Sequence, residues 1–289
     1  MELKWNRWKV INQNLGSDLE KNFEIFNFTW CRSIMLGDVI VIDELLVGAK
    51  CRSPVRVHIP RKPHPNGHLY YFAAIKLDNC DRWFILYIDP FLKKNERPSF
   101  TSTFKTLLDP VAKLEINVVA DNKFATLDNL AYCFENNINF TMGLALNSLK
   151  EITSSTSKEV VQYKDYDVLF HENKNLYLLY EIGMNDNPFK IISHGMVQNG
   201  TGHQSAKFSG IKRVYKEYFN GVDVFNKVFY SFRWKHRHFK WTSQVLDDAL
   251  SIAISNSFAL YCSNNTKKIK KSLWCKELSE RILKEAFRK

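Results

Sequence analysis

Two short runs of β-branched, apolar residues that end in acidic residues stand out along the chain. Val39 to Ile42 leads into Asp43 and Glu44, and Ile116 to Ala120 leads into Asp121. Continuous apolar runs of this length are typical of buried strands. In open α/β sheets, ligands bind beyond the carboxyl ends of such strands. The pattern therefore predicts two buried strands that each deliver a carboxylate to the edge of a sheet.

Each aspartate also has a simpler interpretation. An Asp at the end of a strand is a common turn residue, or the N-cap of the next helix. Taken alone, Asp43 or Asp121 fits that interpretation better than the role of a metal ligand. The case for a site therefore depends on what accompanies the two residues.

Short apolar segments and turn-rich stretches alternate along the first half of the chain. The predicted strands span residues 39–42, 55–59, 69–75, 83–88, 116–120 and 138–146. Apolar residues spaced three or four apart predict helices over residues 5–29, 102–114 and 126–136. This order predicts an α/β fold with an RNase H-like mixed sheet flanked by helices.

The character of the sequence changes after residue 148. A polar, linker-like stretch at 152–157 precedes short strands predicted over 160–163, 176–182 and 189–193. Helical spacing returns over 212–219, 222–232, 245–261 and 267–289. We therefore predict a first part of the sheet domain over 1–148, an inserted β-rich element over 149–206, and a helical completion over 207–289 that ends in a basic helix.

Composition narrows the classes of function. The 289 residues include 41 Lys and Arg against 30 Asp and Glu, which gives a net charge of +11. This excess favours a polyanionic partner, most simply nucleic acid, although an unspecialised basic protein has the same composition. The six cysteines form no CxxC pair, which argues against a disulfide framework or zinc knuckle. The sequence shows no signal peptide and no apolar run of about 18 residues, so no membrane partner is expected. It also shows no phosphate-binding glycine loop.

Three stretches, taken together and in order, resemble the piggyBac family of transposases. The first joins Ile42-Asp43-Glu44 to the proline-rich turn at 60–67, and the second is Ala120-Asp121-Asn122-Lys123-Phe124. The third runs from Tyr218 through Gly221-Val222-Asp223 to Asn226. Lys240-Trp241 and the segment 255–261 add to the similarity, which covers roughly residues 10–262.

The resemblance implies an RNase H-like catalytic fold, an insertion before the third aspartate, and metal-dependent cleavage and transfer of DNA strands. The family's catalytic carboxylates fall on Asp43, Asp121 and Asp223, and a further ligand position falls on Asn226. Carboxylates suit Mg²⁺ or Mn²⁺, and two such ions about 4 Å apart can activate the attacking oxygen and stabilise the leaving oxygen. The implied partners are double-stranded DNA and a second copy of the chain in a homodimer.

The chain also departs from the family pattern. Asn226 stands where the family commonly has Asp, Asn220 replaces a glycine, and the zinc-binding C-terminal domain and N-terminal regions are missing. These departures favour a rival interpretation, a catalytically decayed or host-adopted DNA-binding protein, whereas the intact Asp trio argues against it. A second rival is an unrelated α/β protein of the same composition, in which the three aspartates would lie far apart.

Basic residues near the predicted site lie in two stretches of the sequence, 50–62 and 233–240. We predict that eight of them contact DNA phosphates: Lys50, Arg52, Arg61, Lys62, Arg233, Lys235, Arg237 and Lys240. For the second stretch, the alternative is a solvated loop in which Trp241 anchors the next helix. A lysine-rich run at 267–271 fits a nuclear-localisation signal, from which we predict nuclear localisation; DNA contact and a plain solvated helix end are the alternatives.

Overall fold

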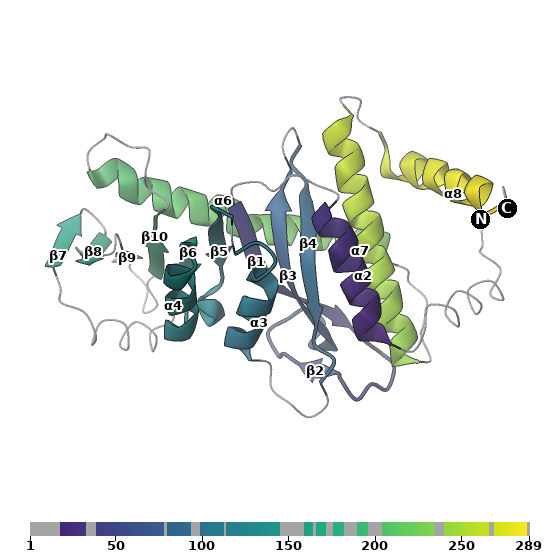
Figure 1. The fold of residues 1–289 in the computed structure, drawn as a ribbon, viewed down its shortest axis with the longest axis horizontal. Coiled ribbons are helices and arrows are strands. Elements are labelled where there is room, and N and C mark those ends of the chain that lie inside the picture. The colour runs from purple at the N-terminus through teal and green to yellow at the C-terminus, as the bar shows by residue number, and fades with distance from the viewer. Residues whose placement is uncertain are drawn as a thin grey trace.

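A mixed β-sheet with helices on both faces forms the centre of the molecule (Figure 1). The computed structural model describes residues 18–32, 39–77, 80–93, 99–112, 114–144, 159–163, 166–171, 176–181, 190–195, 204–233, 240–265 and 269–287. Its strands are β1 (Val39–Gly48), β2 (Val57–His58), β3 (Asn66–Lys76), β4 (Trp83–Pro90), β5 (Asn117–Ala120), β6 (Asn139–Gly143), β7 (Glu159–Tyr163), β8 (Tyr166–His171), β9 (Leu176–Glu181) and β10 (Lys190–His194). Its helices are α2 (Leu19–Arg32), α3 (Phe100–Leu108), the short 3₁₀ helix η1 (Asn122–Phe124), α4 (Leu127–Glu135), α6 (Gln204–Phe232), α7 (Trp241–Asn264) and α8 (Lys271–Phe287).

The strands follow the order β2-β3-β1-β5-β6-β10-β9-β8-β7, and β4 pairs with β3. β1 is central: it runs antiparallel to β3 on one side and parallel to β5 on the other. β5 and β6 are parallel, and β10 returns antiparallel to β6. The predicted mixed sheet flanked by helices is confirmed.

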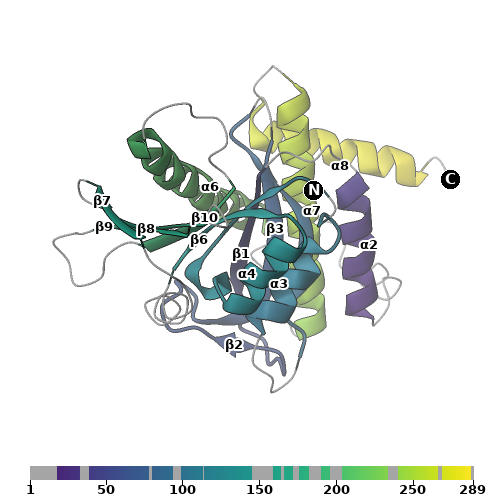
Figure 2. The same ribbon diagram turned by 60° about the vertical axis from the view of Figure 1, so that its left-hand side comes forward.

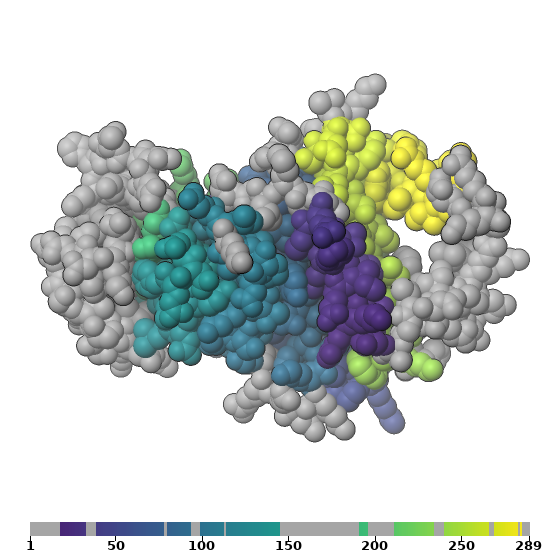
Figure 3. Space-filling model, in the orientation of Figure 1, coloured from purple at the N-terminus to yellow at the C-terminus, as the bar shows by residue number. Residues whose placement is uncertain are grey.

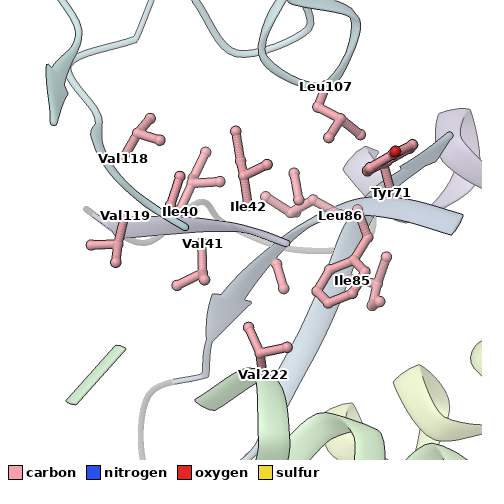
Figure 4. Close-up of a cluster of buried hydrophobic side chains, with 14 of the residues drawn as sticks. Ile40, Val41, Ile42, Tyr71, Ile85, Leu86, Leu107, Val118, Val119 and Val222 are labelled. Atoms are coloured by element: carbon pink, nitrogen blue, oxygen red, sulfur yellow. The ribbon is translucent and has the colours of Figure 1, made fainter. Parts of the chain in front are cut away.

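The core lies on both faces of β1 and β5. Figure 4 shows Ile40, Ile42 and Val118 pointing towards Leu107 of α3 on one face, whereas Val41 and Val119 point towards Val222 of α6 on the other. The strand residues in this set have no exposed surface, and Leu107 and Val222 have almost none. This double burial explains why β1 reads as a continuous apolar run rather than as an alternating one.

The helices form layers around the sheet. Helices α3 and α4 cover one face near β1, β5 and β6, whereas α6 crosses the opposite face (Figures 1 and 2). Helices α2 and α7 lie beside the β4 edge, and Figure 3 shows α2 against the surface formed by the blue and teal segments. Helix α8 is joined to this body through Trp274, which packs with Phe232 and Phe258. Within the described residues, no helix has the length and apolarity needed to cross a membrane.

Two asparagine side chains cover the outer edge of β4. Asn27 of α2 accepts from the Ile88 N–H and donates to the Ile88 carbonyl at 2.9 and 2.8 Å. Asn256 of α7 does the same for Ile85, with both distances 2.9 Å. Because an unpaired strand edge leaves backbone groups without partners, these amides take the place of a further strand.

The helical segments predicted over 212–219 and 222–232 form one continuous helix, α6. The reason is that Gly221 serves close packing rather than a turn. A Cβ at this position would stand only 1.8 Å from Cζ2 of Trp83, so only glycine lets the helix approach the start of β4 so closely. The pattern around Asn220 and Gly221 therefore suggested a break where none exists.

β1 continues to Gly48, beyond its predicted end at residue 42, and the β-rich segment contains one strand more than predicted. The predicted strands at 160–163, 176–182 and 189–193 correspond to β7, β9 and β10, and β8 was missed. All four belong to the same sheet as β1, where they extend it beyond β6. The predicted division of the chain at 148 and 206 stays a prediction, and residues 5–17 of the first predicted helical region lie outside the described residues.

Candidate active site

The register of two parallel strands brings Asp43 and Asp121 to the same place in the sheet. β1 and β5 are paired from Val39 with Asn117 to Ile42 with Ala120, so each aspartate directly follows the last matched pair. β5 ends there, whereas β1 continues to Gly48 with β3 as its partner. The two predicted carboxylates therefore lie beside each other at the end of β5.

Both carboxylates belong to the sheet face that α6 covers. Side chains alternate between the two faces along a strand. Val41 and Val119 point towards Val222 of α6 (Figure 4), and Asp43 and Asp121 come two positions after them. The chain thus places two oxygen-rich side chains between the end of β5 and a long helix.

Asp43 is a buried carboxyl group with only 8% of its surface exposed. Burial raises the pKa of Asp43 to about 7, although the Lys123 ammonium and a hydrogen bond from the Glu44 backbone act in the opposite direction. A carboxyl group whose pKa lies near neutral pH, held in the interior beside a second carboxylate, is typical of functional sites.

Asp121 combines the two roles that its sequence position left open. Its Oδ1 accepts a hydrogen bond from the Asn122 N–H at 2.7 Å, which makes Asp121 the N-cap of η1. Its Oδ2 lies 3.2 Å from Lys123 Nζ. The cap holds the carboxylate in a fixed orientation at the strand end, so the capping interpretation and a ligand role are compatible.

Glu44 is held by two lysines on the other face of the sheet. Its Oε2 lies 2.5 Å from Lys123 Nζ, and its Oε1 lies 3.4 Å from Lys62 Nζ. Its cross-strand partner is Tyr71, which packs against Phe124. Glu44 is thus the anion of a compact ion-pair cluster next to the aspartate pair.

Helix α6 adds a tyrosine to the aspartate pair. Burial raises the pKa of Tyr215, and the nearby Asp121 and Asp43 carboxylates raise it further. The phenol occupies the space that a side chain at Gly143 would need, because a Cβ there would stand 2.8 Å from Tyr215 Oη. The ring also stacks on Phe219, with centroids 5.2 Å apart.

Asn226 supplies a buried oxygen on the same helix. The neighbouring Phe225 contacts Phe72, which is the cross-strand partner of Asp43, with ring centroids 5.9 Å apart. The Asn226 Oδ1 is buried, and no hydrogen-bond partner for it exists among the described residues. A buried acceptor without a donor is costly, so this oxygen suits a ligand such as a divalent cation.

The third predicted carboxylate, Asp223, is exposed on α6. It follows the buried Val222, and successive helix residues turn by about 100°. Within the described part of the chain, no three His, Cys, Asp or Glu side chains form a group that could hold a metal ion. The structure therefore brings two of the three predicted carboxylates together and leaves Asp223 at the surface.

The predicted DNA-binding cations have different surroundings. Lys50, Arg52 and Arg61 are exposed on the segment that follows β1, and Lys240 is exposed at the start of α7. Lys62 pairs with Glu44, as described above. Lys235 and Arg237 lie outside the described residues.

Arg233 is directed into the protein. Its Nε donates to Asp248 Oδ1 at 3.1 Å, and its Nη2 donates to the Gly48 carbonyl at 2.9 Å. Tyr70 donates to the other Asp248 oxygen at 3.0 Å, and Gln244 donates to the same Gly48 carbonyl at 3.0 Å. Burial raises the pKa of Asp248 to about 6, against the effect of the guanidinium. This network fixes α6 and α7 to the end of β1.

With this geometry established, comparisons with known proteins identify the family. The profile of a family described as Transposase IS4 matches residues 15–258, which is most of the chain. The chain belongs to this transposase family. The second rival interpretation, that of an unrelated α/β protein, is therefore wrong. A search of curated proteins finds no match.

A solved structure of another protein has a fold similar to that of this transposase-family protein. It is a cryo-EM structure of piggyBac transposase in a synaptic complex with hairpin DNA, and it matches with a TM-score of 0.68 and 18% sequence identity. The match covers 88% of this chain and 54% of that chain, so the present chain spans about half the length of its relative. The predicted RNase H-like fold and the predicted piggyBac resemblance are confirmed.

Two residues at the site have roles that sequence reasoning did not assign. Lys123 is part of the motif after Asp121, but only the structure shows that it reaches both Glu44 and Asp121. Tyr215 precedes the buried Val222 and Phe229 at intervals of seven residues, and this spacing could have placed it on the buried face of α6.

Proposed function

We propose that this transposase-family chain cleaves and joins DNA strands at the Asp43–Asp121 pair with the help of a divalent cation. The parallel register that ends with Ile42 opposite Ala120 carries the proposal, because it sets both carboxylates on one face at one strand end. The membership of the family supports phosphodiester chemistry and divalent-metal dependence in general terms.

Three side chains would hold the cation. They are Asp43, Asp121 and, through its orphaned Oδ1, Asn226. Asp223 is a further candidate ligand. Its binding to metal requires a second, neighbouring ion or a different arrangement of α6. Mg²⁺ or Mn²⁺ fits this all-oxygen donor set and would supply Lewis-acid activation of the attacking and leaving oxygens.

The protein groups around the pair have separate tasks. Asp43, whose pKa burial raises to about 7, would bind the cation as the carboxylate and release its proton. The cap from Asn122 keeps Asp121 oriented, and the phenol of Tyr215 closes the α6 side of the site. The exposed Lys50, Arg52 and Arg61 beyond the end of β1 would meet phosphates of double-stranded DNA.

The DNA in the synaptic complex of piggyBac transposase supports duplex DNA as the partner here. A homodimer and nuclear localisation belong to the same proposal and follow from the resemblance and from the lysine-rich run at 267–271.

The test is cleavage of end-labelled duplex DNA with Mg²⁺, Mn²⁺ or EDTA. We expect metal-dependent cleavage that Asp43→Asn and Asp121→Asn each lower by at least about 10²-fold, because metal coordination contributes several kcal/mol to the transition state. Asp223→Asn measures the third carboxylate in the same assay, and Asp81→Asn is the control because its side chain is 99% exposed.

Cleavage that is equal in the wild type and both pair variants would contradict the proposal. DNA binding without cleavage by the wild type would instead support the decayed or host-adopted protein.

A further inference from the structure

Lys123 spans the end of β5 from one face of the sheet to the other. Its ammonium group lies 2.5 Å from Glu44 on the α3 side and 3.2 Å from Asp121 on the α6 side. The side chain is 20% exposed, so the ammonium is partly withdrawn from water. A lysine therefore stands between the proposed metal ligands and a second, buried carboxylate.

Each oxygen of Asp121 has one partner in this arrangement. Its Oδ1 faces the Asn122 N–H at 2.7 Å and its Oδ2 faces the Lys123 ammonium. A divalent cation that binds Asp121 would stand close to this ammonium or replace it. Because two cations close together repel each other strongly in a partly buried site, replacement is favoured.

Glu44 provides the place to which the ammonium can withdraw. Its side chain is 7% exposed and it already forms the shorter of the two contacts with Lys123. The more exposed Lys62 fixes Glu44 from the other side at 3.4 Å. Lys123 can therefore leave Asp121 without losing its stronger partner.

We infer that Lys123 is a positioning residue that acts as an internal counter-ion. It holds Asp121 in the metal-free protein. The balance of its contacts between Asp121 and Glu44 sets the affinity of the site for divalent cations. This inference rests on the proposed function, because it assumes that Asp121 binds the cation.

The inference predicts opposite effects for the two partners in the ion pair. Lys123→Met removes the competing charge, so Mn²⁺ should bind on the order of tenfold more tightly. Glu44→Gln leaves the aspartate pair as the remaining charged partners of Lys123, so Mn²⁺ should bind several-fold, about 3- to 10-fold, more weakly. Lys123→Arg keeps the charge and should stay within about 2-fold of the wild type.

The experiment is Mn²⁺ titration of the full chain, followed by the electron paramagnetic resonance signal of free Mn²⁺ and by calorimetry at constant pH. Lys76→Met is the control, because Lys76 forms similar ion pairs with Glu217 and Asp81 away from the site. Thermal unfolding by circular dichroism shows that each variant is folded, and the Lys123→Arg and Glu44→Gln variants keep the test decisive if Lys123→Met does not fold.

The outcomes separate this inference from the proposed function. Mn²⁺ binding that Asp121→Asn abolishes, but that Lys123→Met leaves unchanged or weakens, overturns the role of Lys123 while the proposed function stands. Equal effects of Lys123→Met and Lys76→Met also overturn it. Absence of Mn²⁺ binding by the wild type overturns both proposals.

Discussion

Two groups of buried carboxylates adjoin β1, and they differ in how their oxygens are used. At the end of β1, Asp248 has both oxygens engaged, one by Arg233 and the other by Tyr70. Five residues before that end, Asp43 lies in the aspartate pair on the face that α6 covers, and the buried Asn226 oxygen of α6 has no donor among the described residues. Burial raises the pKa of both aspartates, to about 6 and about 7.

The comparison shows that burial and a raised pKa do not by themselves identify a functional carboxylate. The Asp248 group holds α6 and α7 to a strand end, and its hydrogen bonds saturate it. Beside the Asp43 group, helix α6 carries the buried Asn226 oxygen, which has no donor among the described residues. The state of the hydrogen bonds therefore separates a structural group from a candidate site.

The largest expected difference between the two groups concerns stability. Asp248→Ala leaves the Arg233 guanidinium partly buried without its carboxylate, which costs roughly 3–5 kcal/mol of unfolding free energy. Urea unfolding monitored by tryptophan fluorescence measures this loss. An Asp248→Ala variant as stable as Asp81→Asn would contradict the structural role.

A smaller effect is expected from Asp247, whose pKa burial and the neighbouring Asp248 raise from 3.8 to about 8. The folded protein holds this proton more tightly than the unfolded chain does. The stabilisation that it contributes is therefore complete below about pH 4 and is lost as the pH rises through about 8. Asp247→Asn should raise the unfolding free energy by roughly 1–3 kcal/mol at pH 8 and by less at pH 5.

Urea unfolding at pH 5, 6.5 and 8 tests this, with Asp81→Asn as the exposed control. Asp43, Asp89 and Asp248 shift in the same direction, so part of the pH slope should remain in the variant. A slope identical to that of the wild type would disprove the assignment to Asp247.

A third comparison removes single hydroxyl groups, one inside the Asp248 network and one outside it. Tyr70→Phe deletes a donor to the buried Asp248 and should cost roughly 1.5–3 kcal/mol. Tyr230→Phe deletes a bond of 2.8 Å to the Leu46 carbonyl at a half-exposed position and should cost about 1 kcal/mol. Equal losses of unfolding free energy in the two variants would show that the Asp248 network contributes no more to stability than an ordinary hydrogen bond near the surface.

Much of the fold was predictable because the sheet is buried on both faces. Apolar runs such as Val39 to Ile42 have few alternatives to an internal strand, and the capped strand end at Asp121 carries a clear turn signal. The continuity of α6 through Gly221 was not predictable, since it depends on contact with Trp83, a residue 138 positions earlier in the chain.

The site was predictable only in part, for a similar reason. Asp43 and Asp121 each follow a strand, and a parallel register then brings them together. The positions of Asp223, Arg233 and Lys123 depend on how helices and turns rotate against the sheet. Local sequence does not encode that rotation. Arg233 was therefore predicted to contact DNA, although its guanidinium donates to Asp248.

The most direct test of the account is the shift of the unfolding temperature caused by Mn²⁺, measured on the wild type, Asp43→Asn, Asp121→Asn and Asp247→Asn. A ligand that binds only the folded protein raises the unfolding temperature. We predict that Mn²⁺ stabilises the wild type and Asp247→Asn equally and has no effect on either variant of the pair. Stabilisation that persists in Asp43→Asn and Asp121→Asn would contradict the claim that these two residues form the metal-binding site.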